Sequence, residues 1–326
     1  MELALYGPDG YFTSGPLRSA KAGDFLTSPE VSSMFGSTLA VFVEQEMVRI
    51  REPFHLIEVA AGSGTLLGPL LATFPVSAWA VEVSASARNA ICAILPEQQV
   101  VGDLAEISDP IRGVILANEF VDNLPMAIAQ LTPVGWRERW VGLDGDQLTF
   151  VDHEVRQEVA NWLHSYSGPV EPGGWVEVQL EAAAWLKTAL ERLTAGSVVL
   201  IDYGDLAENL APRRRDGTLR TYRSHHLGPH PLDEPGATDI TADVNFSALV
   251  AVAQSAGASV ELHRQDDFLA SLGLRQRLAD LRRTELELAR RGETDARLRT
   301  RSLVSEAETL LHQRGLGDFR VLVATK

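Results

Sequence analysis

A short apolar stretch that breaks into a glycine turn, LIEVAAGSGTLLG at residues 56–68, constrains the fold more than any other part of the chain. Residues 56–60 have the composition of a buried strand, and the apolar residues after Gly64 begin a helical pattern. A turn through Gly62 and Gly64 lets backbone N–H groups approach a ligand closely. The stretch therefore predicts a strand, a tight turn and a helix, with a ligand at the turn or with nothing bound there.

Strands and helices alternate on both sides of this stretch. Helical periodicity over residues 34–50 ends near Pro53, and the helix after the glycine turn runs to about Thr73. A further helix is expected at 84–95, and further strands are expected at 78–83, 99–102 and 113–118. This order predicts the α/β class, with a doubly wound, mostly parallel sheet whose strands end at one ligand-binding edge.

The second half of the chain departs from this order. Residues 127–151 alternate apolar and polar side chains around a DGD turn, which predicts an inserted antiparallel hairpin or small meander. Residues 205–244 are rich in Pro, Gly, His and Arg, which predicts a long loop. The remaining expected elements are helices at 175–193, 245–257 and 268–314, and strands at 197–204, 259–265 and 319–325.

The composition narrows the classes of partner. The chain has 326 residues and a net charge of -15, which disfavours general binding to nucleic acid or to anionic membranes because like charges repel. Its one cysteine, Cys92, excludes an internal disulfide and a cysteine-based zinc site, and its apolar setting predicts a core position. We find no secretory signal pattern and no run of about 18 apolar residues, so no membrane insertion is expected and the cytoplasm is the expected location.

Candidate ligand-binding residues surround the glycine turn. Glu58, Gly62 and Gly64 form the spacing E-x-x-x-G-x-G. Ala60 and Leu67 stand where a dinucleotide fingerprint would have its first and third glycines. A glycine turn after an acid suits a cationic ligand such as S-adenosylmethionine, which has an ammonium, a sulfonium and no phosphate. The alternative is a turn that only packs a helix on a strand.

Two further strand ends carry residues suited to a nucleoside. Glu82 ends the 78–83 strand, where its carboxylate can accept hydrogen bonds from both ribose hydroxyls of an adenosine. Both NAD and S-adenosylmethionine satisfy this pattern. Asp103 and Leu104 follow the next strand, where the acid can pair with the adenine amino group and the leucine can pack on the ring.

Polar side chains also follow the fourth strand, in ANEFVDNLPM at residues 117–126. Carboxylates at Glu119 and Asp122, beside Asn118, could hold a guanidinium or ammonium group and orient its lone pair toward a methyl carbon. The alternative is a helix N-cap with acids in the first turn, which Asp122 fits well and Glu119 fits poorly.

Three later residues are expected near the same edge. The 197–204 strand brings Asp202 and Tyr203 there, and His225 in the long loop is either a proton acceptor or a polar surface residue. Arg213, Arg214 and Arg215 predict a solvated turn, and the arginine-rich helices after residue 275 predict a solvated face.

Ten segments and their order indicate a family. They are GYF, GDFLTSPEVSSMFG, EVAAGSGTLLGPLL, VEVS, ANEFVDNLPM, GWRERWV, VLIDYG, GTLRTYRSHH, PGATDITADVNF and LGLRQRL. In these segments the chain resembles the MidA-like, S-adenosylmethionine-dependent class I methyltransferases, from about residue 3 to the C-terminus. GDFLTSPE and ANEFVDNLP are the distinctive segments, whereas the glycine turn alone is generic.

The resemblance implies a seven-stranded methyltransferase sheet, S-adenosylmethionine as cofactor and a protein substrate. Mitochondrial members of the family methylate an arginine of a complex I subunit and support assembly of that complex. Glu119, with Asp122 as a second candidate, would free a guanidinium lone pair, and His225 matches the loop histidine of the family. The implied cofactor contacts are Glu58, Gly62, Gly64 and Glu82, with Asn118 beside the methyl group and Gly23, Asp24, Thr27, Ser28 and Glu30 in an N-terminal lid.

The resemblance also implies a division of the chain and marks two departures. The expected parts are the lid at 1–50, the cofactor domain at 51–126, the β insertion at 127–174, and the second half of the domain at 175–326. The family pattern has glycine where Ala60 stands. An alanine fits there if its φ is negative, and its methyl group is expected to narrow the approach to the ligand. The family pattern also has a further helical stretch ahead of residue 1. A non-catalytic assembly factor and an NAD-dependent oxidoreductase are the alternative functions, and the missing dinucleotide fingerprint disfavours the second.

Overall fold

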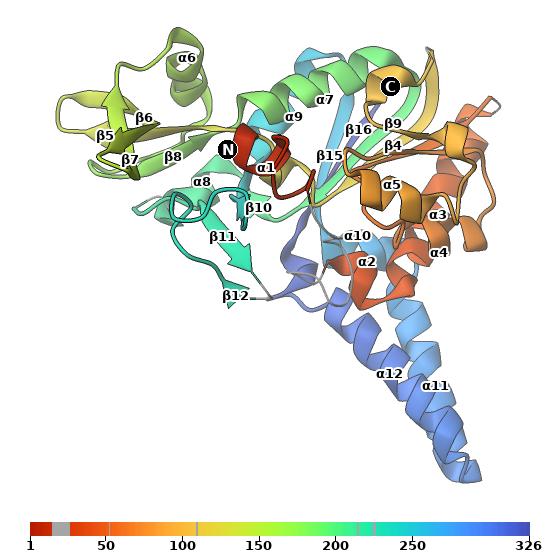
Figure 1. Cartoon of the computed structure of the whole chain (residues 1–326). Helices are drawn as coiled ribbons and strands as arrows, with labels where there is room; N and C mark the ends of the chain where they lie inside the picture. The colour runs from red at the N-terminus through yellow and green to blue at the C-terminus, as the bar shows by residue number, and fades with distance from the viewer. Residues whose placement is uncertain (15–26, 52, 109, 214, 224–225) are drawn as a thin grey trace.

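The computed structural model describes residues 1–14, 27–51, 53–108, 110–213, 215–223 and 226–326. A seven-stranded sheet forms its centre, in the order β15-β16-β9-β4-β1-β2-β3 (Figure 1). The strands are β1 (His55–Val59), β2 (Ala78–Val81), β3 (Val100–Val101), β4 (Ile111–Asn118), β9 (Leu193–Asp202), β15 (Ser259–Arg264) and β16 (Arg320–Thr325). Only β16 runs against its neighbours β9 and β15. The predicted doubly wound, mostly parallel sheet is therefore confirmed.

Apolar side chains on both faces explain why helices cover the sheet on two sides. Successive residues of β1 point to opposite faces, so Leu56 and Ile57 belong to different cores. The core that contains Leu56 is closed by α3 (Ser33–Ile50) and α4 (Leu67–Thr73). The core that contains Ile57 is closed by α7 (Leu180–Arg192) and α9 (Phe246–Ser255). A short helix, α5 (Ala85–Ile91), follows β2. Cys92 comes directly after α5 and is exposed, so its predicted core position is wrong.

A four-stranded antiparallel sheet forms beside the main sheet, in the order β7-β6-β5-β8 (Figure 1). Its elements are β5 (Ala127–Thr132), β6 (Gly135–Asp144), β7 (Gln147–His153), β8 (Trp175–Val178) and the covering helix α6 (Gln157–Tyr166). The predicted antiparallel insertion is confirmed, but the predicted helix at 175–193 begins too early. Val176 and Val178 alternate inward onto Ala129 and α6, so this part follows the period of a strand rather than of a helix.

The stretch predicted as a loop at 205–244 contains short ordered elements. They are β10 (Gly204–Asp205), α8 (Ala207–Leu210), β11 (Arg220–Arg223), β12 (His226–Leu227), β13 (Asp239–Thr241) and β14 (Val244–Asn245). β11 pairs antiparallel with both β12 and β13. Arg213 is exposed, as predicted for a solvated turn, and it also donates to the buried Asp243 at 2.6 Å. Ion pairs of this kind hold the segment 205–244 in a defined conformation although its composition is typical of a loop.

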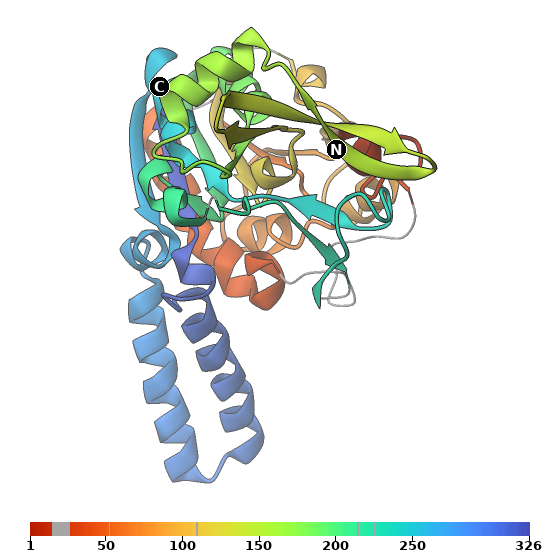
Figure 2. The ribbon, with the colours of Figure 1, turned by 90° about the vertical axis from the view of Figure 1, so that its left-hand side faces the viewer.

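The arginine-rich helices form an arm that projects from the body (Figure 2). After α10 (Gln265–Ser271), helices α11 (Leu274–Arg291) and α12 (Thr294–Leu310) lie side by side and antiparallel. Their arginines are exposed, as predicted. At the N-terminal end of the chain, α1 (Glu2–Tyr6) and α2 (Ser28–Val31) are short helices near the sheet edge described next. In the part of the chain that the structure describes, no helix is both long and apolar enough to span a membrane.

Candidate active site

A cavity of 810 Å³ lies at the carboxyl ends of β1, β2 and β4. These ends meet where the strand order switches direction around β1, the place where open α/β sheets bind ligands. Segments from α1, α2 and α7 complete its walls. The predicted site residues that line it are Thr27, Glu30, Glu58, Gly62, Glu82, Asp103, Leu104, Asn118 and Glu119.

The turn after β1 has the left-handed backbone that its glycines predict. Gly62 has φ +53° and Gly64 has φ +78°. Ala60 has φ +53°, so the negative φ that would let an alanine fit here without strain is not present. The turn needs a left-handed residue at this position whatever the side chain is. Gly64 does not line the cavity. A Cβ atom at this position would lie 2.5 Å from Ile94 Cδ1, so this side of Gly64 faces the side chain of Ile94.

Two carboxylates, Glu58 in β1 and Glu82 directly after β2, line the floor of the cavity. The amide of Gly62 donates to Glu82 Oε2 at 2.8 Å, and the amide of Ser84 donates to Oε1 at 2.8 Å. Burial raises the pKa of Glu82, and these amides oppose that shift. Glu58 is 4% exposed, and burial together with the charge of Glu82 raises its pKa well above the ordinary value. The floor therefore favours a cation or a hydrogen-bond donor above it.

At one end of the cavity, Asp103 and Leu104 follow β3. Asp103 Oδ1 accepts the amide of Ala105 at 2.7 Å and caps the single turn η2 (Leu104–Glu106). This bond fixes the direction of Leu104, a largely buried side chain that forms part of the wall. An apolar wall beside a carboxylate has the form expected for a base and ribose site.

At the other end of the cavity, Glu119 follows β4 with φ +52°. Its Oε1 accepts from Asn118 Nδ2 at 3.1 Å and from the amide of Ser28 at 3.3 Å. Removal from water and the negative charge of Asp122 raise the pKa of Glu119 to about 8. A half-buried carboxylate with this pKa can hold a proton or a cation near neutral pH.

Helix α2 closes the cavity above Glu119. Thr27 and Glu30 form a capping box, in which Glu30 Oε2 accepts the amide of Thr27 at 3.0 Å. Ser28 does not line the cavity, because its hydroxyl accepts from the buried Gln265 at 3.2 Å on the other side. The cavity side of α2 is therefore formed by Thr27, Pro29 and Glu30.

Asp122 does not reach the cavity. It lies in the single turn η3 (Val121–Asn123), and its side chain is bound to Tyr203 and to Thr241 in the interior. Two residues were predicted to act on the substrate cation. Glu119 lines the cavity, whereas Asp122 does not. The predicted Gly23, Asp24 and His225 lie outside the described residues.

Three acceptor atoms around the cavity lack a hydrogen-bond partner: Glu30 Oε1, Glu58 Oε2 and Asn118 Oδ1. Buried acceptors without partners are costly, so such atoms indicate a missing donor. The ammonium group of S-adenosylmethionine supplies up to three donors, and its positive charge suits an acidic floor. The donor set therefore fits this cofactor. Among the described residues, no group of His, Cys, Asp or Glu is arranged to hold a metal ion.

Comparison with known proteins identifies the family. Residues 37–263 match the model of a family described as S-adenosyl-L-methionine-dependent methyltransferases. The chain belongs to this family. It is 30% identical to the mouse protein arginine methyltransferase NDUFAF7, mitochondrial, over 98% of this chain and 78% of that protein. The human protein of the same name is 30% identical over 85% of this chain and 70% of its own length.

A solved structure extends the comparison to three dimensions. A protein from Burkholderia thailandensis, bound to S-adenosyl-homocysteine, has a TM-score of 0.85 and 27% identity. The match covers all of this chain and 86% of that one. This chain is therefore an S-adenosylmethionine-dependent methyltransferase, as the sequence predicts, rather than an NAD-dependent oxidoreductase.

Sequence reasoning missed the aromatic walls of the methyltransferase site. The ring centroids of Phe120 and Trp185 lie 4.9 Å apart in an edge-to-face arrangement, and both side chains line the cavity. Tyr6 and Phe12 line it from the N-terminal segment. The sequence of α7 does contain a pattern that could have identified one of these walls. The residues of α7 that line the cavity recur at helical spacing and so share one face of the helix: Glu181, Ala184, Trp185, Thr188 and Arg192. That spacing marks a second functional face on the helix.

Proposed function

We propose that this methyltransferase transfers a methyl group to an arginine side chain of a partner protein. The observation that carries the proposal is Glu119, a half-buried carboxylate at the cavity wall with a pKa of about 8. The unpartnered oxygens of Asn118 and Glu30 lie around the same cavity. Anionic and amide oxygens in this arrangement suit a guanidinium, which presents several N–H donors in a plane. The names of the mouse and human relatives support the same substrate class.

The chain supplies positioning, charge and exclusion of water. S-adenosylmethionine supplies an activated methyl group when it is bound. A guanidinium nitrogen is a weak nucleophile while its lone pair is delocalised, and carboxylates near one nitrogen localise the positive charge there. Methylation of a guanidinium nitrogen releases one proton, and Glu119 is the group that we assign to hold it. The aromatic pair of Phe120 and Trp185 excludes water from the same end.

A complex I subunit is the acceptor that we propose to test first. The family resemblance of GDFLTSPE and ANEFVDNLPM motivates this choice, because mitochondrial members methylate such a subunit. The net charge of -15 also favours a partner segment that is basic around its target arginine.

The decisive experiment uses the purified protein and S-adenosylmethionine with a deuterated methyl group. The acceptor is an extract of the source organism from which this gene has been deleted, so that target sites are unmethylated. We expect mass spectrometry to find deuterated methylarginine in one or a few proteins, and Glu119→Gln to reduce the label at least tenfold. Label on lysine or on a carboxylate would refute the arginine assignment. Binding of S-adenosylmethionine without any label would favour the non-catalytic assembly factor.

A further inference from the structure

The backbone of Glu119 is in a conformation that a glutamate rarely adopts. Its φ of +52° lies in the left-handed region, where the Cβ of an L residue crowds the following carbonyl. Such a residue persists only where its surroundings determine the backbone. Since Glu119 comes directly after the last residue of β4, the direction of its side chain depends on how this turn is held.

One buried carboxylate holds the turn. The amides of Phe120, Val121 and Asp122 all donate to Asp202 Oδ2, at 3.2, 3.1 and 3.2 Å. Three consecutive amides that converge on one carboxyl oxygen form a backbone nest of the kind that binds anions. Burial and the charges of Asp122 and Glu119 raise the pKa of Asp202, and the amides of Asp122 and Tyr203 oppose that shift. The amide of Glu119 donates separately to the carbonyl of Ile201 at 2.7 Å. Every backbone N–H from 119 to 122 is therefore bound to the end of β9.

Asp202 has no access to the cavity. It is 1% exposed and absent from the lining, and its Oδ1 accepts the amide of Tyr203 at 2.9 Å. β9 pairs with β4 as far as Asn118 and Ile201, so the carboxylate is fixed relative to the turn by the main sheet. A residue placed in this way affects the reaction through the backbone that it holds and through its charge, which acts on Glu119 across the turn.

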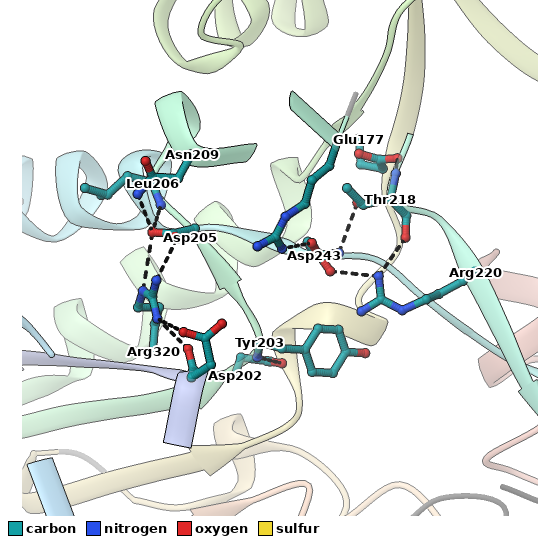
Figure 3. Close-up of polar contacts among 12 residues, drawn as sticks. Glu177, Asp202, Tyr203, Asp205, Leu206, Asn209, Thr218, Arg220, Asp243 and Arg320 are labelled. Carbon is teal, nitrogen blue, oxygen red and sulfur yellow. Dashed lines mark hydrogen bonds and ion pairs between the residues drawn. The ribbon is translucent and has the colours of Figure 1, made fainter. Parts of the chain in front are cut away.

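A second set of contacts holds the far side of the turn. The hydroxyl of Tyr203 is bound to Asp122 and Thr241, and the guanidinium of Arg220 lies 4.9 Å from the centre of the Tyr203 ring. Arg220 in turn donates to Asp243 at 2.7 Å (Figure 3). This set explains why the side chain of Asp122 points away from the cavity while the neighbouring Glu119 lines it.

We propose that Asp202 is a positioning residue of the methyltransferase, whose carboxylate fixes the turn that directs Glu119 into the cavity. This inference rests on the proposed function, in which Glu119 faces the methyl group and the substrate cation. It goes beyond that function by assigning the catalytic geometry to a side chain that touches neither cofactor nor substrate. Loss of the Asp202 carboxylate is expected to free Glu119 from its left-handed conformation and to weaken its action on a cation in the cavity.

The chain offers a matched control three residues further along. Asp205 is also buried, and it accepts from Leu206, Asn209 and Arg320, with Arg320 Nη2 at 2.6 Å (Figure 3). None of these bonds involves the turn at 119–122. Asp205→Asn therefore perturbs a comparable polar cluster at the end of β9 without touching Glu119.

The test compares Asp202→Asn, Asp202→Ala, Asp205→Asn and Glu119→Gln in the full chain. Calorimetric titration with S-adenosylmethionine and with S-adenosylhomocysteine gives an affinity ratio that reports the charge facing the methyl position, because only the first ligand has a sulfonium. In the parent we expect the affinity ratio to rise as the pH passes from 6.5 to 9, because Glu119 becomes negatively charged over this range. In Glu119→Gln we expect this contribution to the rise to be absent. We expect Asp202→Ala to lower the ratio at pH 9 on the order of tenfold, and Asp205→Asn to leave it unchanged.

Asp202→Asn keeps the shape and one acceptor, so it tests the proposal even if Asp202→Ala does not fold. We expect the amide hydrogens of 120–122 to exchange on the order of tenfold faster in Asp202→Asn, with a reduced affinity ratio, and to be unchanged in Asp205→Asn. The proposal is overturned if Asp202→Asn and Asp205→Asn have the same exchange rates and the same ratio. A parent that binds S-adenosylmethionine but methylates no arginine would instead refute the proposed function and leave the ratio test in force.

Discussion

Replacement of Ala60 by glycine is expected to stabilise the protein. Ala60 has φ +53°, and the left-handed region costs an L residue about 1–2 kcal/mol. Glycine removes that cost but loses more freedom on folding, which offsets about 0.5–1 kcal/mol. The side chain of Ala60 is exposed to the cavity, so its removal forfeits little packing. The net expectation is a gain of about 0.5–1 kcal/mol in the free energy of unfolding.

The assay is equilibrium urea unfolding of the parent and of Ala60→Gly without ligand. The neighbouring Ala61 is 5% exposed and is not among the non-glycine residues with positive φ. Ala61→Gly is therefore the matched control, with an expected loss of about 1–2 kcal/mol from backbone freedom and the buried methyl group. The reasoning about Ala60 is refuted if both glycine variants lower stability to a similar extent. Since glycine also widens the approach to the turn, affinity for S-adenosylmethionine should be equal or higher in Ala60→Gly.

Three further predictions follow from the carboxylates of the site and its support. The folded pKa of Glu119 is raised to about 8, so its stabilising effect is complete below about pH 4.5 and is lost as the pH rises through 8. Urea midpoints of parent and Glu119→Gln should therefore shift in favour of the glutamine variant between pH 5 and 9, and an equal difference at both values would contradict this. Glu58→Gln should weaken S-adenosylmethionine and S-adenosylhomocysteine alike by about tenfold in calorimetry, because both carry the ammonium group; selective loss of one ligand would assign Glu58 to a different part of the cofactor. Asp243→Ala should lower the free energy of unfolding by about 2–4 kcal/mol, because it leaves Arg213 and Arg220 without their shared partner, and a change below about 1 kcal/mol would show that both are solvated instead.

The sequence indicated the floor of the site because that part depends on local order. Glu58, Gly62 and Glu82 follow strands whose direction and sequence fix them at one edge of a parallel sheet. Their roles need no knowledge of distant contacts. The same logic placed Asn118 and Glu119 beside them, at the end of β4.

The sequence failed where two residues close in the chain point in opposite directions. The sequence kept Asp122 as a second candidate beside Glu119, but only Glu119 lines the cavity. The difference comes from Tyr203 and Thr241, which are far away in the chain and bind Asp122 in the interior. A pattern of neighbouring residues contains no information about such partners.

The boundary of the helix at 175–193 failed for a related reason. Trp175–Val178 has side chains acceptable in either a strand or a helix, and pairing with β5 decides for the strand. Cys92 and Arg213 show the same limit, since the exposure of Cys92 and the ion pair of Arg213 with Asp243 depend on how other elements of the fold are placed.

By itself the sequence determined the α/β class, the succession of the main strands along the chain and the acidic edge, because periodicity and strand-end chemistry are local properties. The choice of cofactor came from the resemblance of its segments to a family. The tertiary structure alone decided which acid faces the cavity, through Asp202, which holds the turn, and through Tyr203 and Thr241, which bind Asp122. The Asp202 carboxylate gathers three amides from a turn about eighty residues earlier in the chain and keeps Glu119 in a left-handed conformation. Local preference opposes this conformation, so only contacts between distant segments can maintain it.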